Sequence, residues 1–155
     1  MSDIIALRAI GSVIGGRSEA TDDDWDKVEA AIALDPAQFG NDATAGLGDF
    51  SHIEVVFHFD RVGNDEINTG ARHPRGRRDW PLVGIFAQRG KARPNRIGVT
   101  VCRLLSADGL ALRVRGLDAI DGTPVLDIKP VMKGFLPRGE VREPEWAKAL
   151  MAGYW

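Results

Sequence analysis

Short segments in which apolar and polar residues alternate recur along this chain of 155 residues. The clearest is SHIEVVFHFD, residues 51–60, where every second side chain from Ile53 to Phe59 is large and apolar. A period of two residues is typical of a β-strand with one buried face. Six further segments predict strands: IIALRAIGSVI (4–14), KVEAAIALD (27–35), LVGIFA (82–87), IGVTVCRLL (97–105), LALRVRG (110–116) and VLDIKP (125–130).

The predicted strands are short and are separated by turn signals, such as SADG at residues 106–109. Such a pattern favours a barrel or a sandwich, and we predict a mainly all-β fold, a single small β-barrel with long loops. The only convincing helix is predicted in a C-terminal tail, residues 140–155, where Pro144 suits a first turn and Gly153 a stop. We expect one domain, residues 1–155, that buries roughly 70% of its unfolded surface.

Charge is distributed unevenly, although the formal net charge is only −2. Residues 1–60 carry 3 basic and 12 acidic side chains, whereas residues 61–103 carry 10 basic and 3 acidic ones. This basic middle third is either a set of solvated loops or a site for an anion such as phosphate or nucleic acid.

Several classes of protein are not supported by the sequence. Cys102 is the only cysteine, so no intrachain disulfide or cysteine-built zinc site is expected. The three histidines do not predict a metal site, and the motifs of dinucleotide, P-loop, zinc-protease and serine-hydrolase sites are missing. No signal peptide and no stretch of roughly 20 apolar residues is seen. We therefore expect a cytoplasmic protein without a membrane segment.

Two polar turns at predicted strand ends indicate a polar pocket. The first, RGKARPNR at residues 89–96, places four positive charges before a strand and contains a proline that cannot pair regularly. The second, RGLDAIDGTPVLDIKP at residues 115–130, carries Asp118 and Asp121 around a short apolar step. Each turn taken alone is better explained as a structural turn with capping aspartates, whereas the two turns together, at adjacent strand ends, favour the pocket.

The same two turns carry a family resemblance. GIFAQRGKARPNRIGVTVCRLL and GLDAIDGTPVLDIKP resemble the TsaA/TrmO-like family, also called YaeB-like, whose pattern is close to GVFATRSPxRPNPIG and DLLDGTPVLDIKPY. GLGDFSHIEVVFHFD matches a third block, so the resemblance covers roughly residues 46–130. The chain departs at Arg96 and Val131, where the family has proline and tyrosine, and at GGRSEATDDDWDK, where tRNA enzymes carry a proline-glutamine-proline-glycine stretch.

The resemblance implies an S-adenosylmethionine-dependent methyltransferase that uses a β-barrel. Known tRNA members methylate the exocyclic amine of a modified adenosine beside the anticodon, so tRNA is the expected substrate. The alternative is a non-catalytic barrel that binds RNA or a nucleotide-like ligand through its basic middle third. The resemblance also implies a homodimer, which agrees with the aromatic C-terminal tail; that tail would pack on a partner or on its own barrel.

The resemblance also implies the residues of the site. The cofactor contacts fall on Asp60, Arg61, Arg89, Val99, Arg115, Gly116, Leu117 and Asp118. An arginine fork suits the carboxylate of the cofactor, and an aspartate suits its ribose diol or ammonium. Substrate contacts are expected at Lys91, Arg93, Asn95, Arg96, Asp121 and Lys129. No catalytic base is assigned, although Asp118 and Asp121 are candidates.

Overall fold

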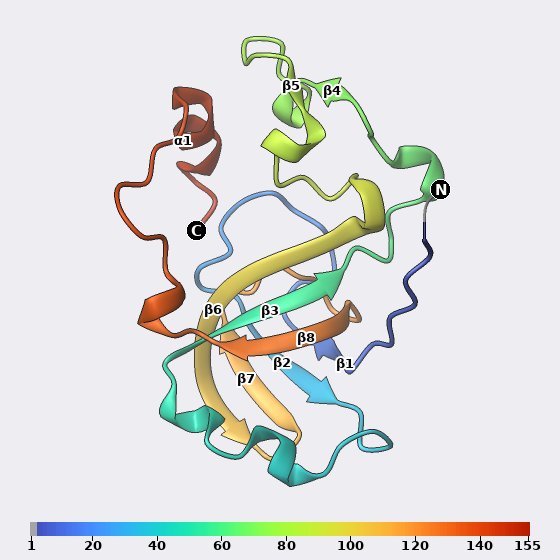
Figure 1. The fold of residues 1–155 in the computed structure, drawn as a ribbon, viewed down its shortest axis with the longest axis vertical. Helices are drawn as coiled ribbons and strands as arrows, with labels where there is room; N and C mark the ends of the chain where they lie inside the picture. The colour runs from blue at the N-terminus through green and yellow to red at the C-terminus, as the bar shows by residue number, and fades with distance from the viewer. Residues whose placement is uncertain (1–2) are drawn as a thin grey trace.

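Six antiparallel strands close into a barrel in the computed structural model, which describes residues 3–155 (Figure 1). Around the barrel the order is β1–β2–β7–β6–β3–β8, and Gly11 of β1 pairs with Val125 of β8 to close it. The strands are β1 (Gly11–Ile14), β2 (Glu29–Leu34), β3 (His52–His58), β6 (Ile97–Asp108), β7 (Ala111–Arg115) and β8 (Pro124–Pro130). The predicted β-barrel is thereby confirmed.

Alternation places one set of side chains from each strand inside the barrel. Ile53, Val55 and Phe57 of β3 are 0–1% exposed, as the period of two in that segment predicts. Ile32, Leu112, Val114, Val13 and Val125 complete the innermost layer. Phe57 has room because its partner across β3 and β6 is Gly98.

Residues 97–102 of β6 alternate between the core and the outer face of the barrel. Thr100 and Cys102 point inward and are 7% and 3% exposed, whereas Val99 and Val101 lie on the outer face of β6. The larger apolar side chains of this segment therefore face away from the core. Their position places an uncovered apolar stripe on the outside of the barrel.

Two predicted strands are shorter than expected. Residues 4–10 are extended and largely exposed, and pairing begins only at Gly11. In LVGIFA only β5 (Val83–Gly84) is a strand, and it pairs with β4 (Ala71–Arg72) in a separate two-stranded sheet. A 3-10 turn follows, in which Ile85 is buried while the next side chain, Phe86, is 80% exposed.

Short helices occupy the loops and the C-terminal tail. The 3-10 helices are η1 (Asn41–Thr44), η2 (Leu47–Asp49), η3 (Asn64–Glu66), η4 (Pro74–Gly76), η5 (Ile85–Ala87), η6 (Pro94–Arg96) and η7 (Lys133–Phe135). Among residues 3–155 there is one α-helix, α1 (Glu145–Met151), which begins directly after Pro144 in the predicted tail. Within residues 3–155, no helix is long and apolar enough to cross a bilayer.

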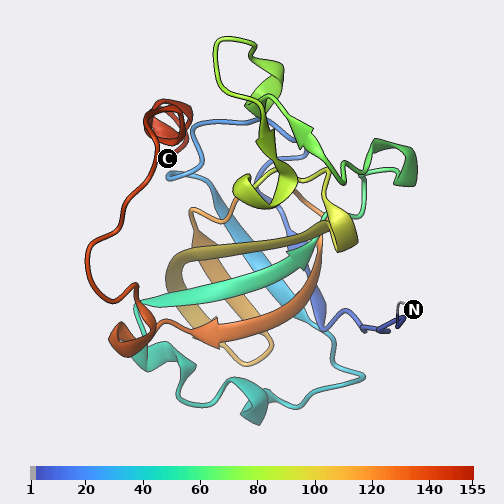
Figure 2. The ribbon, with the colours of Figure 1, turned by 45° about the horizontal axis from the view of Figure 1, so that its top comes forward.

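The C-terminal tail comes back to the barrel after α1 (Figure 2). The backbone amides of Asp24 and Trp25 donate to the carbonyls of Gly153 and Tyr154, at 3.0 and 2.9 Å. Trp25 is 2% exposed, so the tail is bonded to a loop residue whose side chain is buried. The tail thus packs on its own chain, which is one of the two positions predicted for it.

Candidate functional site

The RPN turn is held by its own arginines. Arg93 donates through Nη1 to the carbonyl of Gln88 at 2.7 Å, and Arg96 donates to the carbonyl of Val62. Asn95 and Arg96 have φ angles of 61° and 52°, a left-handed conformation that these side-chain bonds help to maintain. Two of the four positive charges in this turn therefore bind backbone, and their substrate role stays a prediction.

Arg89 and Lys91 lie on the exposed side of the same turn. Arg89 donates through Nη2 to the carbonyl of Val99 at 2.6 Å, which brings its guanidinium to the edge of β6 that faces away from β3. A guanidinium has five N–H donors, so this bond leaves donors for a carboxylate or a phosphate. Arg89 and Val99, both predicted as cofactor contacts, are thus neighbours in the fold.

Asp118 lies at one end of the barrel, just after β7. Gly116 has a φ of +82° and donates its backbone N–H to the carbonyl of Val28, which turns the chain inward. Leu117 then enters the core at 1% exposure. Because these two neighbours are anchored, the half-buried Asp118 side chain is held at the mouth of the barrel.

Two hydroxyl groups bind the Asp118 carboxylate. Thr100 donates to Oδ1 and Tyr154 donates to Oδ2. Thr100 comes from β6 and Tyr154 from the C-terminal tail, so three distant segments meet at one carboxylate. Neither hydroxyl was predicted from the sequence.

The charge of Asp118 affects two neighbouring groups. Burial, followed by the negative charge of Asp118, raises the pKa of the Cys102 thiol to about 12. Burial and then Asp118 also raise the pKa of the Tyr154 phenol, while the positive charge of Arg89 acts in the opposite direction. Both groups therefore stay neutral near pH 7, with Asp118 as the adjacent acceptor.

A second group of predicted residues surrounds Asp121. Its Oδ1 accepts the backbone N–H of Gly15 at 2.7 Å, and its own N–H donates to the carbonyl of Arg17 at 2.7 Å. Arg61 donates to the carbonyls of Ser18 at 3.2 Å and Asp121 at 3.5 Å. Asp121 thus has the turn-capping contacts that were the structural alternative.

The remaining predicted residues are spread around these two groups. Asp60 is exposed beside Arg61, and Arg115 is half-buried at the end of β7. Lys129 lies on the outer face of β8 and forms an ion pair with Asp127 at 3.3 Å. The contacts described here bring Arg89, Val99 and the segment 115–118 close to Tyr154, whereas those of Lys129 lie elsewhere.

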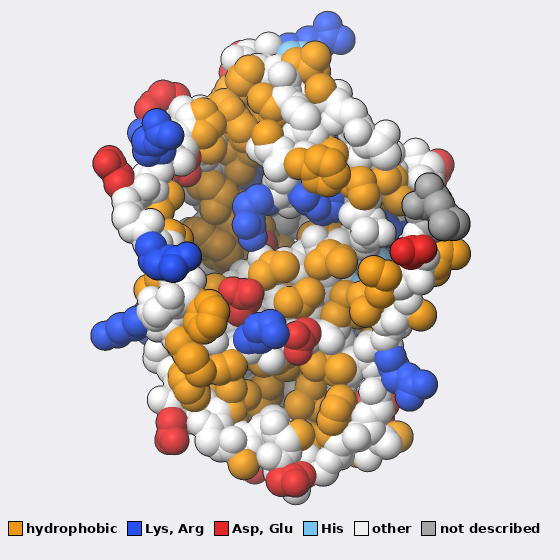
Figure 3. Space-filling view, in the orientation of Figure 1, with side chains coloured by type: hydrophobic (Ala, Val, Ile, Leu, Met, Phe, Trp, Pro, Cys, Tyr) orange, Lys and Arg blue, Asp and Glu red, His pale blue; other side chains and the backbone are white. Residues whose placement is uncertain are grey.

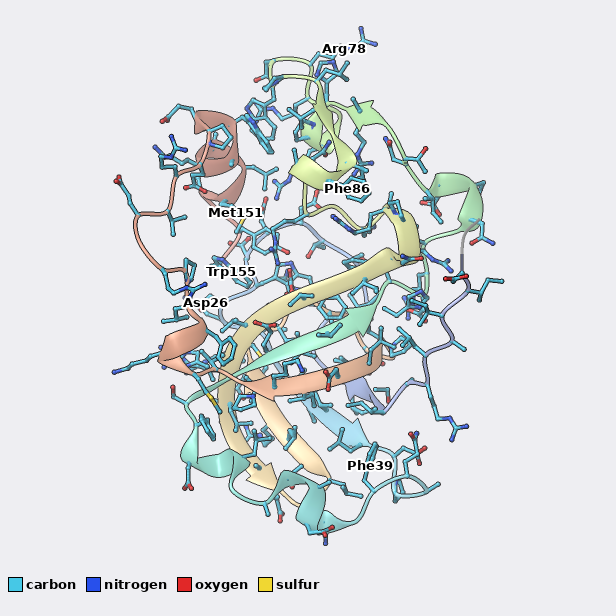
Figure 4. The ribbon with its side chains drawn as sticks, in the orientation of Figure 1. Asp26, Phe39, Arg78, Phe86, Met151 and Trp155 are labelled. Carbon is cyan, nitrogen blue, oxygen red and sulfur yellow. The ribbon has the colours of Figure 1, made fainter. Side chains whose placement is uncertain are left out.

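A hollow separates the C-terminal tail from the barrel (Figure 3). Hydrophobic side chains line its depth, and basic side chains stand near its edge. Figure 4 places Met151 and Trp155 beside it, on the side of the tail. A hollow with apolar side chains in its depth and charged side chains at its edge suits a ligand that carries both an aromatic base and charged groups. Among residues 3–155, no cluster of His, Cys, Asp and Glu could hold a metal ion.

Comparison with known proteins adds a family to this geometry. Residues 22–135 match the model of the tRNA-methyltransferase O N-terminal domain. A human tRNA (adenine(37)-N6)-methyltransferase is 37% identical over 99 residues, 64% of this chain but 22% of that protein. A probable S-adenosyl-L-methionine-binding protein of Methanothermobacter thermautotrophicus is 38% identical over 135 residues, 84% of this chain and 93% of that protein.

A crystal structure of TrmO from Pseudomonas aeruginosa shares the fold, with a TM-score of 0.72 and 26% identity, over 90% of this chain and 62% of the other. The chain thus spans about a fifth of the human methyltransferase and less than two thirds of the solved one. The predicted resemblance is confirmed, and this chain belongs to the tRNA-methyltransferase O N-terminal domain family.

Proposed function

We propose that this chain is an S-adenosylmethionine-dependent methyltransferase that acts on the exocyclic amine of an adenosine in tRNA, at position 37 by analogy with its named relatives. The observation that carries the proposal is the group formed by Arg89, the Val99 carbonyl and Asp118 at one end of the barrel. These residues lie in the segments matched by the family model.

The donors and acceptors of this group fit the cofactor. The guanidinium of Arg89 would bind the carboxylate of its methionine tail, and Asp118 would accept hydrogen bonds from the ribose diol or the ammonium. The backbone of residues 115–118 would meet the adenine edge, and Leu117 and Val99 would pack against its faces. When bound, the cofactor supplies a methyl group already activated by a sulfonium.

The residues of the chain would align the acceptor amine, exclude water and accept a proton. Asp118 and Asp121 are the two candidate carboxylates for that proton: both oxygens of Asp118 accept a hydroxyl, and Oδ1 of Asp121 accepts the Gly15 amide. Asp60 and Arg61 would form the outer edge of the site. Lys91, Arg93, Asn95 and Arg96 would meet the phosphates of tRNA, and Asp121 and Lys129 are proposed as further substrate contacts.

The chain would act as one domain, residues 1–155, within a cytoplasmic homodimer. The outer face of β6 supports the dimer, because Val99, Val101 and Leu105 are 36–46% exposed there. A second copy on this stripe would cover apolar surface beside Arg89 and add a wall to the site.

A binding and transfer experiment tests this function. S-adenosylmethionine is titrated into the protein by calorimetry, and the same protein is then incubated with unmodified and threonylcarbamoyl-modified tRNA. We expect cofactor binding and methylated adenosine in the nucleoside digest. A protein that binds tRNA but neither binds the cofactor nor transfers a methyl group would instead be the non-catalytic barrel.

A further inference from the structure

The C-terminal tail reaches the candidate site from outside the family-matched part of the chain. The family model ends at residue 135, whereas Tyr154 is the penultimate residue. Two backbone hydrogen bonds from Asp24 and Trp25 fix residues 153 and 154 against the barrel. A segment that the family model does not include therefore supplies a hydroxyl to Asp118.

The two hydroxyls determine how the Asp118 carboxylate is presented. Each oxygen receives one donor, Thr100 on Oδ1 and Tyr154 on Oδ2, so rotation of the carboxylate would break both bonds. An ionised carboxylate has about four acceptor positions, and two of them stay available for a ligand.

We infer that Tyr154 is a positioning residue for the cofactor site: it orients Asp118 toward the bound cofactor, and the tail behind it forms one wall of that site. The inference rests on the proposed function, because it takes Asp118 as a cofactor contact. Tyr154 itself acts through Asp118.

The side chains around Tyr154 are consistent with the second part of the inference, in which the tail forms one wall of the cofactor site. Trp155 packs edge-on against the Tyr154 ring, with centroids 4.8 Å apart. Met151 and Trp155 both lie beside the hollow between tail and barrel (Figure 4). Arg89 is close enough for its charge to act on the Tyr154 phenol. The tail thus bonds to Asp118 and lies near Arg89, two of the proposed cofactor residues.

The variant Tyr154→Phe removes the hydroxyl and keeps the ring. Thr44→Val is the matched control, because the Thr44 hydroxyl donates to the Gly109 carbonyl at 2.6 Å in the loops at the other end of the barrel. We expect the dissociation constant for S-adenosylmethionine to rise roughly tenfold in Tyr154→Phe, as for loss of one hydrogen bond to a charged group, and to stay unchanged in Thr44→Val.

Steady-state kinetics separate positioning from a purely structural role. Loss of positioning raises the Michaelis constant for the cofactor and leaves that for tRNA unchanged, whereas partial unfolding lowers kcat at constant Michaelis constants. Thr100→Val should produce the same pattern, because it removes the other hydroxyl. A chain ending at Gly139 should bind the cofactor at least as weakly as Tyr154→Phe.

Three outcomes decide the matter. Wild-type protein that does not bind S-adenosylmethionine refutes the proposed function, whatever the tail does. Wild-type protein that binds it, with Tyr154→Phe and the truncated chain equal to wild type, overturns the inference and leaves the function intact. Weakened cofactor binding in Tyr154→Phe, with an unchanged Michaelis constant for tRNA, supports the inference.

Discussion

A methyl group on residue 98 would stand 2.5 Å from Cε2 of Phe57, so the phenyl ring occupies the space that any side chain at Gly98 would need. Phe57 is 1% exposed and packs edge-on against Phe59, with ring centroids 5.2 Å apart. The ring cannot withdraw without disturbing the core. The glycine that precedes the outer apolar stripe of β6 is therefore required by the packing inside the barrel.

Gly98→Ala should accordingly lower the free energy of unfolding by about 1–3 kcal/mol, the usual cost of overpacking a core. Gly48→Ala is the control, since nothing lies within 4 Å of a Cβ built there. Urea unfolding followed by circular dichroism measures both. Equal midpoints for the two variants would show that Phe57 can move aside.

Arg89→Ala should weaken S-adenosylmethionine binding by about 1.5–3 kcal/mol, because a charged hydrogen bond is lost. Arg103→Ala is the control, because it removes a positive charge from an exposed position in β6. This variant is expected to bind the cofactor as wild type does. Calorimetry compares the two variants. Unchanged affinity in both Arg89→Ala and Asp118→Asn would rule out this placement of the cofactor.

Cys102 should not react with thiol reagents in the folded protein at pH 8, since burial and Asp118 raise its pKa to about 12. It should react at once in urea. A reagent that modifies native Cys102 as fast as the unfolded thiol would place this residue outside the core.

The same shift predicts a pH dependence of stability. A folded pKa above the unfolded value of about 9 means that the stabilisation is complete below pH 9 and is lost as pH rises toward 12. The free energy of unfolding should fall in that window with a slope that steepens toward about 1.4 kcal/mol per pH unit as the unfolded thiol becomes fully ionised. The slope is best measured between pH 9 and 10, before Tyr154 contributes in the same direction. Cys102→Ala, although less stable, should lack this part of the slope.

The proposed homodimer should survive removal of the tail. Residues 153 and 154 bond to the loop of their own chain, and the exposed stripe on β6 is independent of them. Sedimentation equilibrium should therefore give a dimer for the full chain and for one ending at Gly139, and a monomer for Val101→Glu. A full-length monomer that still binds the cofactor would refute the dimer.

Alternation predicted most of the barrel because each paired strand has one face in a single closed core. It was only partly right at LVGIFA, where Val83–Gly84 form a short strand outside the barrel and the backbone N–H of Ile85 donates to the carbonyl of Gly70. Nothing in a short apolar run distinguishes a strand from a loop that buries one isoleucine.

The site was predicted in part for a similar reason. Asp118 and Arg89 lie in unusual turns that resemble a family, so their sequence context was informative. Tyr154 lies 36 residues from Asp118 and outside that resemblance, and only the fold brings the two together. The aromatic residues of the tail indicated that it packs against another surface, but they did not indicate that Tyr154 would bind Asp118.

The central claim is methyl transfer to tRNA by this barrel, and mass spectrometry of nucleosides tests it most directly. Purified protein is incubated with S-adenosylmethionine carrying a deuterated methyl group and with tRNA bearing the threonylcarbamoyl modification. The account predicts deuterated methyl on the exocyclic amine of that adenosine, and much less of it with Arg89→Ala or Asp118→Asn at the same subsaturating cofactor concentration. Unlabelled tRNA after incubation with wild-type protein that has bound the cofactor would contradict it.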